Sequence, residues 1–280
     1  MIFWFRFLAH WPLWALHAIG QVIGWLAWLL SPTYRRRFLA NVKTAGLNGW
    51  QVLGAVGQAG CMSTELPRLW MGRQPKVEWR EGAFQTIEAA YAEGQGVLFL
   101  TPHLGCFEMT AQAVAHAFSA AQGPLTVLFR PSRQKGLAQV MEASRARPGL
   151  ETAPTTLAGV RQMIKALRAG RSVGLLPDQV PPEGMGQWVP FFGKPAYTMT
   201  LAARLALQTG AKLVLIWGER LSWGRGYCIH ASVLQEELAS DVDTVVLQIN
   251  QAMERLILTR PEQYLWGYAR YKQPRQEPHA

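Results

Sequence analysis

The chain has 280 residues with 28 lysines and arginines against 18 aspartates and glutamates, giving a net charge of +10. A chain of this length can bury a large core, and three cysteines with no CxxC pair argue against a secreted disulfide scaffold. The basic charge indicates a polyanionic partner, which is a nucleic acid, an anionic membrane surface or an acidic protein.

The N-terminal segment is strongly apolar. Residues 11–30 are interrupted only by His17 and Gln21, and about 20 apolar residues suffice to cross a bilayer core. Tryptophans near both ends are typical of interfacial anchors. Arg35, Arg36 and Arg37 follow, so the positive-inside rule places the C-terminal side in the cytoplasm. We expect residues 1–30 to form a membrane-anchoring helix that either crosses the bilayer or lies in its interface, with a buried soluble helix as a third alternative.

The rest of the chain alternates between helical and strand patterns. Helical spacing covers residues 50–71, 83–93, 110–118, 157–167, 200–208 and 246–257, and buried-strand runs cover 97–100, 125–129, 172–176, 213–217 and 227–233. This alternation predicts an α/β fold with a mixed or mostly parallel sheet flanked by helices. We expect one domain over residues 31–272 and a disordered tail over 273–280.

A histidine and a glutamate stand five residues apart where the apolar run 97–100 ends. Pro102 stops the strand and a helix follows, so His103 lies on the turn and Glu108 in the first helical turn. A carboxylate bound to one imidazole nitrogen leaves the other nitrogen free as a base. A helix cap and a charge opposing the helix dipole would give the same residues. No second histidine has the spacing of a zinc-binding helix, so we expect no metal here.

Reactive side chains also follow two other buried strands. Arg130 comes directly after residues 125–129, and Asp178 follows the strand at 172–176. Ligands of open α/β sheets bind outside the carboxyl ends of the strands. If these strands are parallel, His103, Arg130 and Asp178 converge on one edge.

Three other classes of function compete with a catalytic site in which His103 is the base. Cys106 lies near a helix start and close to His103, an arrangement that suits a thioesterase or another thiol enzyme. The charge alone suggests a nucleic-acid binder, but no recognition motif supports it and we expect no nucleic-acid partner. A non-catalytic lipid-binding protein is the third alternative.

Several segments, taken in order, resemble one family. His103-Leu104-Gly105-Cys106-Phe107-Glu108 is similar to the HX4E motif of the late acyltransferases of lipid A biosynthesis, which belong to the lysophospholipid acyltransferase-like superfamily. Further matching segments are Phe129-Arg130-Pro131, Leu176-Pro177-Asp178-Gln179, Val189-Pro190-Phe191-Phe192-Gly193-Lys194-Pro195-Ala196, Pro261-Glu262-Gln263-Tyr264-Leu265-Trp266 and Arg270-Tyr271-Lys272. The resemblance covers nearly the whole chain.

The resemblance implies an enzyme that moves a fatty acyl chain from an acyl carrier protein to a hydroxyl of a lipid A precursor. His103 would be the general base and Glu108 its orienting carboxylate. Arg130, Arg145 and Asp178 would bind substrate, with Arg147 as an alternative to Arg145. No metal or organic cofactor is implied. The enzyme would sit at the bacterial inner membrane with its catalytic domain in the cytoplasm, and another glycolipid or a lysophospholipid is the alternative acceptor.

Overall fold

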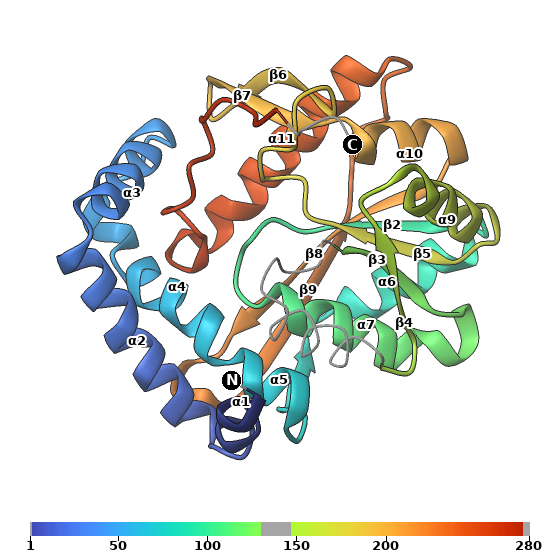
Figure 1. Ribbon diagram of the computed structural model, residues 1–280. Helices are drawn as coiled ribbons and strands as arrows, with labels where there is room; N and C mark the ends of the chain where they lie inside the picture. Colours follow the sequence, from blue (N-terminus) through green and yellow to red (C-terminus); the bar gives the residue numbers. More distant parts are fainter. Residues whose placement is uncertain (1, 130–146, 277–280) are drawn as a thin grey trace.

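The computed structural model describes residues 2–129 and 147–276. Within them, a seven-stranded sheet is covered by helices on both faces (Figure 1). The strands are β1 (Val77–Trp79), β2 (Val97–Leu100), β3 (Leu125–Phe129), β4 (Leu150–Pro154), β5 (Ser172–Leu175), β6 (Gly186–Phe191), β7 (Lys194–Met199), β8 (Lys212–Arg220) and β9 (Tyr227–Val233). The helices are α1 (Ile2–Ala9), α2 (Leu13–Leu30), α3 (Pro32–Thr44), α4 (Gly54–Thr64), α5 (Leu66–Met71), α6 (Ala83–Ala92), α7 (Phe107–Gln122), α9 (Leu157–Arg168), α10 (Leu201–Thr209) and α11 (Val242–Thr259), with short 3-10 turns η1 (Gly49–Val52), η2 (Ser222–Gly224) and η3 (Pro261–Gln263).

The sheet has the order β1-β9-β8-β2-β5-β3-β4, and β6 pairs with β7 in a separate antiparallel hairpin. Strands β8, β2, β5, β3 and β4 run parallel, while β9 runs antiparallel to β8 and carries β1 beside it. The predicted α/β fold with a mixed, mostly parallel sheet is therefore confirmed. The carboxyl ends of the five parallel strands meet at one edge, where ligands of such sheets bind.

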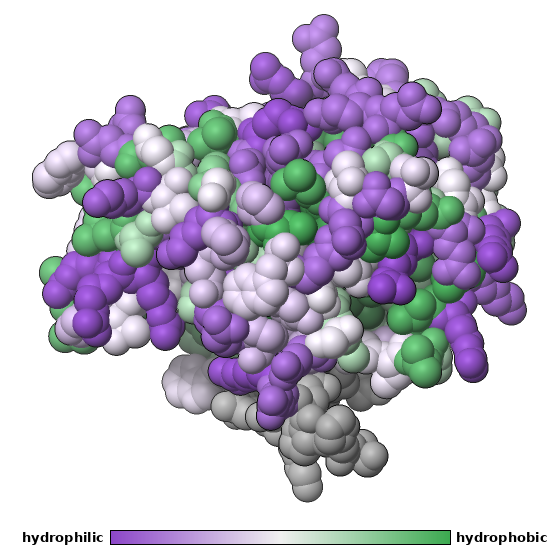
Figure 2. Space-filling view, turned by 90° about the horizontal axis from the view of Figure 1, so that it is seen from above, coloured by the Kyte–Doolittle hydropathy of each residue, from purple (hydrophilic) through white to green (hydrophobic). Residues whose placement is uncertain are grey.

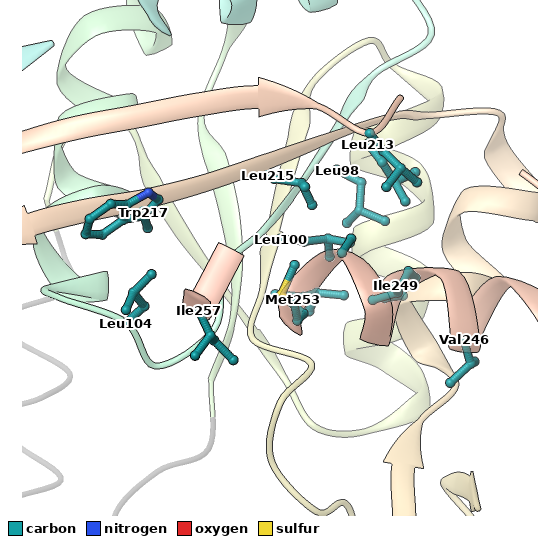
Figure 3. Packing of buried hydrophobic residues seen from close by; sticks show 14 of the residues in the cluster. Leu98, Leu100, Leu104, Leu213, Leu215, Trp217, Val246, Ile249, Met253 and Ile257 are labelled. Carbon is teal, nitrogen blue, oxygen red and sulfur yellow. The ribbon is translucent and has the colours of Figure 1, made fainter. Parts of the chain in front are cut away.

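Strand β2 shows how the core is divided. Leu98 and Leu100 face one side of the sheet and Val97 and Phe99 the other, as the two-residue period of a strand requires. Helices α9, α10 and α11 cover the first side, where side chains of α11 reach those of β2 and β8 (Figure 3). Helices α6 and α7 cover the second side. Burial on both faces explains why VLFL is a continuous apolar run.

The region predicted as one helix over residues 50–71 is divided into η1, α4 and α5. Pro67 lies in the first turn of α5, where its missing N–H is not needed and where it prevents α4 from continuing. The two strands of the β6–β7 hairpin were not predicted from the sequence. Pro190 and Pro195 face each other in it, and proline is tolerated in strands only where no further neighbour needs its N–H.

Helix α2 packs one of its faces against the body of the protein. Among the described residues it is the helix that is long and apolar enough to cross a membrane. Gly20 and Gly24 allow the backbone of α2 to lie directly against α4. A side chain would not fit there, since a Cβ at Gly24 would collide with the carbonyl oxygen of Val56. Leu13 and Leu16 are also buried. This contact joins residues on the two sides of the domain boundary expected at residue 30.

The opposite end of the chain is also attached where it is described. The backbone N–H of Glu183 donates to the carbonyl oxygen of Arg275 at 3.0 Å. Arg275 in the expected tail is thus hydrogen-bonded to the rest of the protein, and residues 277–280 lie outside the described ranges.

Candidate active site

The loop between β2 and α7 carries His103, and neighbouring segments fix its backbone. The N–H of Leu265 donates to the carbonyl oxygen of His103 at 3.2 Å, and the N–H of Gly105 donates to that of Gln263 at 3.0 Å. Gly105 has a φ of 58°. A side chain at Gly105 would also collide with the carbonyl oxygen of Gly218, so only glycine fits this left-handed turn beside β8.

Asp178 binds His103 twice. Its Oδ1 lies 2.8 Å from Nδ1 of the imidazole, and its Oδ2 accepts the backbone N–H of His103 at 2.9 Å. The register of β2 and β5 explains why Asp178 reaches His103. Leu100 of β2 is paired with Leu175 of β5, and His103 and Asp178 follow these two residues at the same distance along the chain. Burial alone would raise the pKa of Asp178, but the positive charge that His103 carries when it is protonated, together with the hydrogen bonds of His103, outweighs burial and lowers that pKa. Asp178 is therefore an ionised partner of the imidazole.

Gln179 contacts the other ring nitrogen. Its amide Nε2 lies 3.0 Å from Nε2 of His103. The carboxylate of Asp178 can only accept, so Nδ1 carries the hydrogen, and the amide N–H then donates to the lone pair of Nε2. This is the neutral tautomer that a general base needs. Gln179 belongs to the matched segment Leu176-Pro177-Asp178-Gln179, but its amide side chain does not ionise and had no predicted role.

Glu108 lies at the start of α7 with different partners. Its Oε2 accepts from the indole N–H of Trp70 at 3.3 Å, and its charge raises the pKa of Arg147, although burial of that guanidinium lowers the pKa more. The orienting role expected of Glu108 stays a prediction. The carboxylate at Nδ1 is that of Asp178, because β5 runs beside β2 and delivers it to the turn.

The arginines predicted for the site are only partly visible. Arg130 and Arg145 lie outside the described residues. Arg147, the alternative to Arg145, is described and donates from Nη1 to the side chain of Gln112 at 2.9 Å and from Nη2 to the carbonyl oxygen of Leu69. It therefore links α5 to α7 beside Glu108.

Two C-terminal residues complete the surroundings of Asp178. Arg270 is buried and donates to the carbonyl oxygen of Tyr197 at 2.7 Å. Its charge contributes to the lowered pKa of Asp178. Tyr264 is also buried, and desolvation together with the nearby charge of Asp178 holds its pKa well above the ordinary value. Tyr264 and Arg270 belong to the two C-terminal segments that resemble the family, and neither side chain had a predicted role.

Cys106 does not have the properties of a nucleophile. It is 1 % exposed, and burial together with the charge of Glu65 holds the pKa of its thiol well above the usual value. A reactive cysteine is an accessible thiolate. The thioesterase alternative based on Cys106 has no support from this geometry.

One group among the described residues could offer ligands to a metal. Atoms of Glu219, Cys228 and His230 lie within 4.8 Å of one another. Both carboxylate oxygens of Glu219 are already engaged, by His230 at 2.9 Å and by Arg260 at 3.2 Å. Arg80 and Arg260 line the adjoining pocket of about 350 Å³, and their charges oppose a divalent cation.

Residues 58–273 match the family described as bacterial lipid A biosynthesis acyltransferase. The lipid A biosynthesis lauroyltransferase of Escherichia coli (strain K12) is 27% identical over 218 residues, which are 76% of this chain and 68% of that protein. The palmitoleoyltransferase of the same organism is 23% identical over 214 residues, covering 75% and 67%. The myristoyltransferase is 25% identical over 197 residues, covering 69% and 58%.

The matched region contains every element of the site described above, from α5 with Trp70 to the C-terminal segment with Arg270. The family match covers far more than half of the chain. The suspected resemblance is thereby confirmed, and the chain belongs to the bacterial lipid A biosynthesis acyltransferase family.

Proposed function

We propose that this acyltransferase moves a fatty acyl chain from the thioester of an acyl carrier protein to a hydroxyl of a lipid A precursor. The observation that carries the proposal is the state of His103. Its Nδ1 is held by the buried carboxylate of Asp178, its Nε2 contacts the amide of Gln179, and its side chain is 15% exposed.

In this mechanism the acceptor hydroxyl replaces Gln179 at Nε2. As the hydroxyl oxygen attacks the thioester carbonyl, its proton passes to Nε2, and Asp178 stabilises the imidazolium that forms. Such a positioned base accelerates a reaction typically about 10²–10⁴-fold. The C–S bond then breaks, and the proton passes from Nε2 to the leaving thiolate. Atoms and charge balance without a further reactant.

Glu108 takes a supporting part in the proposal. Its carboxylate accepts a hydrogen bond from Trp70 and interacts electrostatically with Arg147, so Glu108 positions side chains in the wall of the site beside α7. The arginines of this region, Arg130, Arg145 and Arg147, are suited to anionic groups of the substrates, because a guanidinium binds phosphate with two parallel hydrogen bonds. The basic surface likewise suits an acidic carrier protein.

We place the enzyme at the bacterial inner membrane with the catalytic domain in the cytoplasm. The support is the apolar helix α2 followed by Arg35, Arg36 and Arg37. Anionic lipid attracts each such cation by about 1 kcal/mol near the surface.

The test of the reaction is acyl transfer in detergent, with an acyl carrier protein or coenzyme A thioester as donor and a lipid A precursor or a lysophospholipid as acceptor. We expect His103→Ala to abolish transfer, whereas His116→Ala, on the exposed side of α7, should retain it. Mass spectrometry of the product identifies the preferred donor and acceptor. Equal rates for the two variants would contradict the role of His103.

A further inference from the structure

The inner face of α2 is polar as well as tightly packed. His17 donates to the carboxylate of Glu65 at 3.1 Å, and the hydroxyl of Thr64 donates to the carbonyl oxygen of Leu16 at 2.7 Å. Glu65 in turn is paired with Arg220 at 2.6 Å, and both side chains are 1% exposed. The helix is therefore joined to a buried ion pair of the α/β body.

This attachment determines how α2 can meet a bilayer. A helix of 18 residues is about 27 Å long, close to the thickness of the hydrocarbon core. If α2 crossed the membrane in this fold, α4 would have to enter with it, together with the ion pair of Glu65 and Arg220. Charged groups at membrane depth are costly, and backbone outside a regular helix or barrel is not tolerated against lipid. The packing thus opposes a transverse α2.

The outer face of the same segment is almost wholly apolar. No lysine, arginine, aspartate or glutamate occurs between Arg6 and Arg35. Large hydrophobic side chains stand exposed along α1 and α2, namely Phe3, Trp4, Phe7, Trp14, Ile19, Val22, Ile23, Trp25, Leu26, Leu29 and Leu30. Figure 2 looks onto the end of the molecule with β6 and β7, where hydrophilic residues are interspersed with smaller apolar patches. Most of the large hydrophobic side chains that are exposed among the described residues lie on α1 and α2. These helices run along one side of the protein in Figure 1.

The turn between β8 and β9 adds another aromatic residue to this side. Trp223 is 90% exposed and has a φ of 60°, a left-handed conformation that is uncommon for a bulky residue. The following Gly224 lies against the backbone of Trp14, so the turn is beside the N-terminal end of α2. Tryptophan is enriched at the level of lipid headgroups. Arg225, next in the chain, adds a positive charge there.

The apolar face also has a fixed relation to the active site. Arg220, which binds Glu65 and through it His17, donates from Nη2 to the carbonyl oxygen of Gly105 at 2.9 Å. Gly105 is two residues from His103 in the loop after β2. Hydrogen bonds thus connect α2 to the loop that carries the base.

From these observations we propose that α1 and α2 lie in the plane of an anionic membrane surface instead of crossing it, with Trp223 as a second point of insertion. A lipid surface suits this face because its apolar residues are flanked by Arg35, Arg36, Arg37 and Arg225, and the sequence between Arg6 and Arg35 contains no acidic residue. The inference rests on the membrane attachment proposed above and adds the orientation of the protein. Held this way, the catalytic loop keeps one position relative to lipid acceptors in that surface.

The orientation is tested first with an epitope tag on the N-terminus of the full chain. We expect protease added to intact spheroplasts to leave the tag and protease added to inverted membrane vesicles to remove it, because both ends of α2 are cytoplasmic. Removal in intact spheroplasts would show a spanning α2 and overturn the inference while leaving membrane attachment intact. Recovery of the protein outside the membrane fraction would instead contradict the attachment and the inference together.

The second contact is tested by fluorescence in vesicles of phosphatidylethanolamine and phosphatidylglycerol. In a Cys228→Ser background, bimane is attached at Trp223→Cys, at Ile19→Cys as the reference on α2, and at Trp188→Cys as the control. Trp188 is 46% exposed but lies on β6, away from the N-terminal helices. We expect brominated lipid to quench positions 19 and 223 and to leave 188 unquenched. Quenching at 223 no greater than at 188 would remove Trp223 from the contact.

Discussion

The replacement of Glu65 by glutamine provides a sharp test of how the N-terminal helices are held. The carboxylate of Glu65 accepts two hydrogen bonds from Arg220, at 2.8 and 2.6 Å, and one from the hydroxyl of Tyr227 at 2.8 Å. His17 of α2 adds a fourth at 3.1 Å. Glu65→Gln keeps the shape but removes the charge, so the guanidinium of Arg220 stays buried without a counter-ion.

The size of the effect follows from the burial. Removing one partner of a buried ion pair costs about 3–5 kcal/mol of unfolding free energy. The lowered pKa of Glu65 has the same cause. Burial opposes ionisation of Glu65, but the charge and hydrogen bonds of Arg220 and His17 lower its pKa to about 2.

The assay is thermal unfolding of the purified protein in detergent, followed by the fluorescence of its 12 tryptophans. We expect Glu65→Gln to lower the Tm by about 10 °C, since 1 kcal/mol corresponds to about 2–4 °C for chains near this size. Because the folded pKa of Glu65 is depressed, its contribution is complete above the unfolded pKa. The gap between wild type and variant should therefore shrink as the pH falls from about 4.3 towards 2.

The matched control is Glu78→Gln. Glu78 pairs with Lys76 at 2.6 Å, but the two side chains are 47% and 72% exposed. Exposed pairs contribute little to stability, so this variant should unfold with the wild type. A Glu65→Gln protein that unfolds at the same temperature as Glu78→Gln would refute the account of the buried cluster.

Three further predictions concern the site and the helix contact. Asp178→Asn should lower kcat by about 10³–10⁴-fold with little change in KM, because an amide at Nδ1 can favour the wrong tautomer of His103. Glu108→Gln should lower kcat less. Steady-state transfer kinetics rank the two variants, and the reverse order would show that Glu108 orients the imidazole. Cys106→Ala should keep a near wild-type transfer rate, and a covalent acyl group found on Cys106 by mass spectrometry of the wild type would contradict this. Gly24→Leu should lower the Tm because its side chain meets α4, whereas Val22→Leu, on the exposed face of the same helix, should leave it unchanged.

Sequence patterns accounted for the elements that build the sheet. VLFL and LTVLF are apolar on both faces because β2 and β3 lie inside a parallel sheet, so their strands could be predicted without knowing their neighbours. The edge strands β1 and β4 and the proline-containing hairpin were missed, since short or partly exposed strands carry no continuous apolar signal.

The site was predicted in part. The chain order placed His103 and Asp178 after buried strands, and parallel pairing explains why both reach one edge. Which carboxylate reaches Nδ1 depended on register, because Leu100 is paired with Leu175 and this brings Asp178 to that nitrogen. Spacing along the chain favoured Glu108, and spacing alone cannot show which of two carboxylates faces a ring nitrogen.

The N-terminal helix separates the two kinds of information most clearly. Its length and apolar composition follow from the sequence, and they indicate a membrane contact equally for a spanning and an in-plane helix. Only the tertiary structure decides which face is available to lipid. Gly20, Gly24 and His17 turn one face of α2 towards α4 and Glu65, and these partners come from residues more than 30 positions further along the chain. The spacing of these residues within the helix marks one face, but it cannot show which distant segment that face meets, so the partners are decided only when the chain folds.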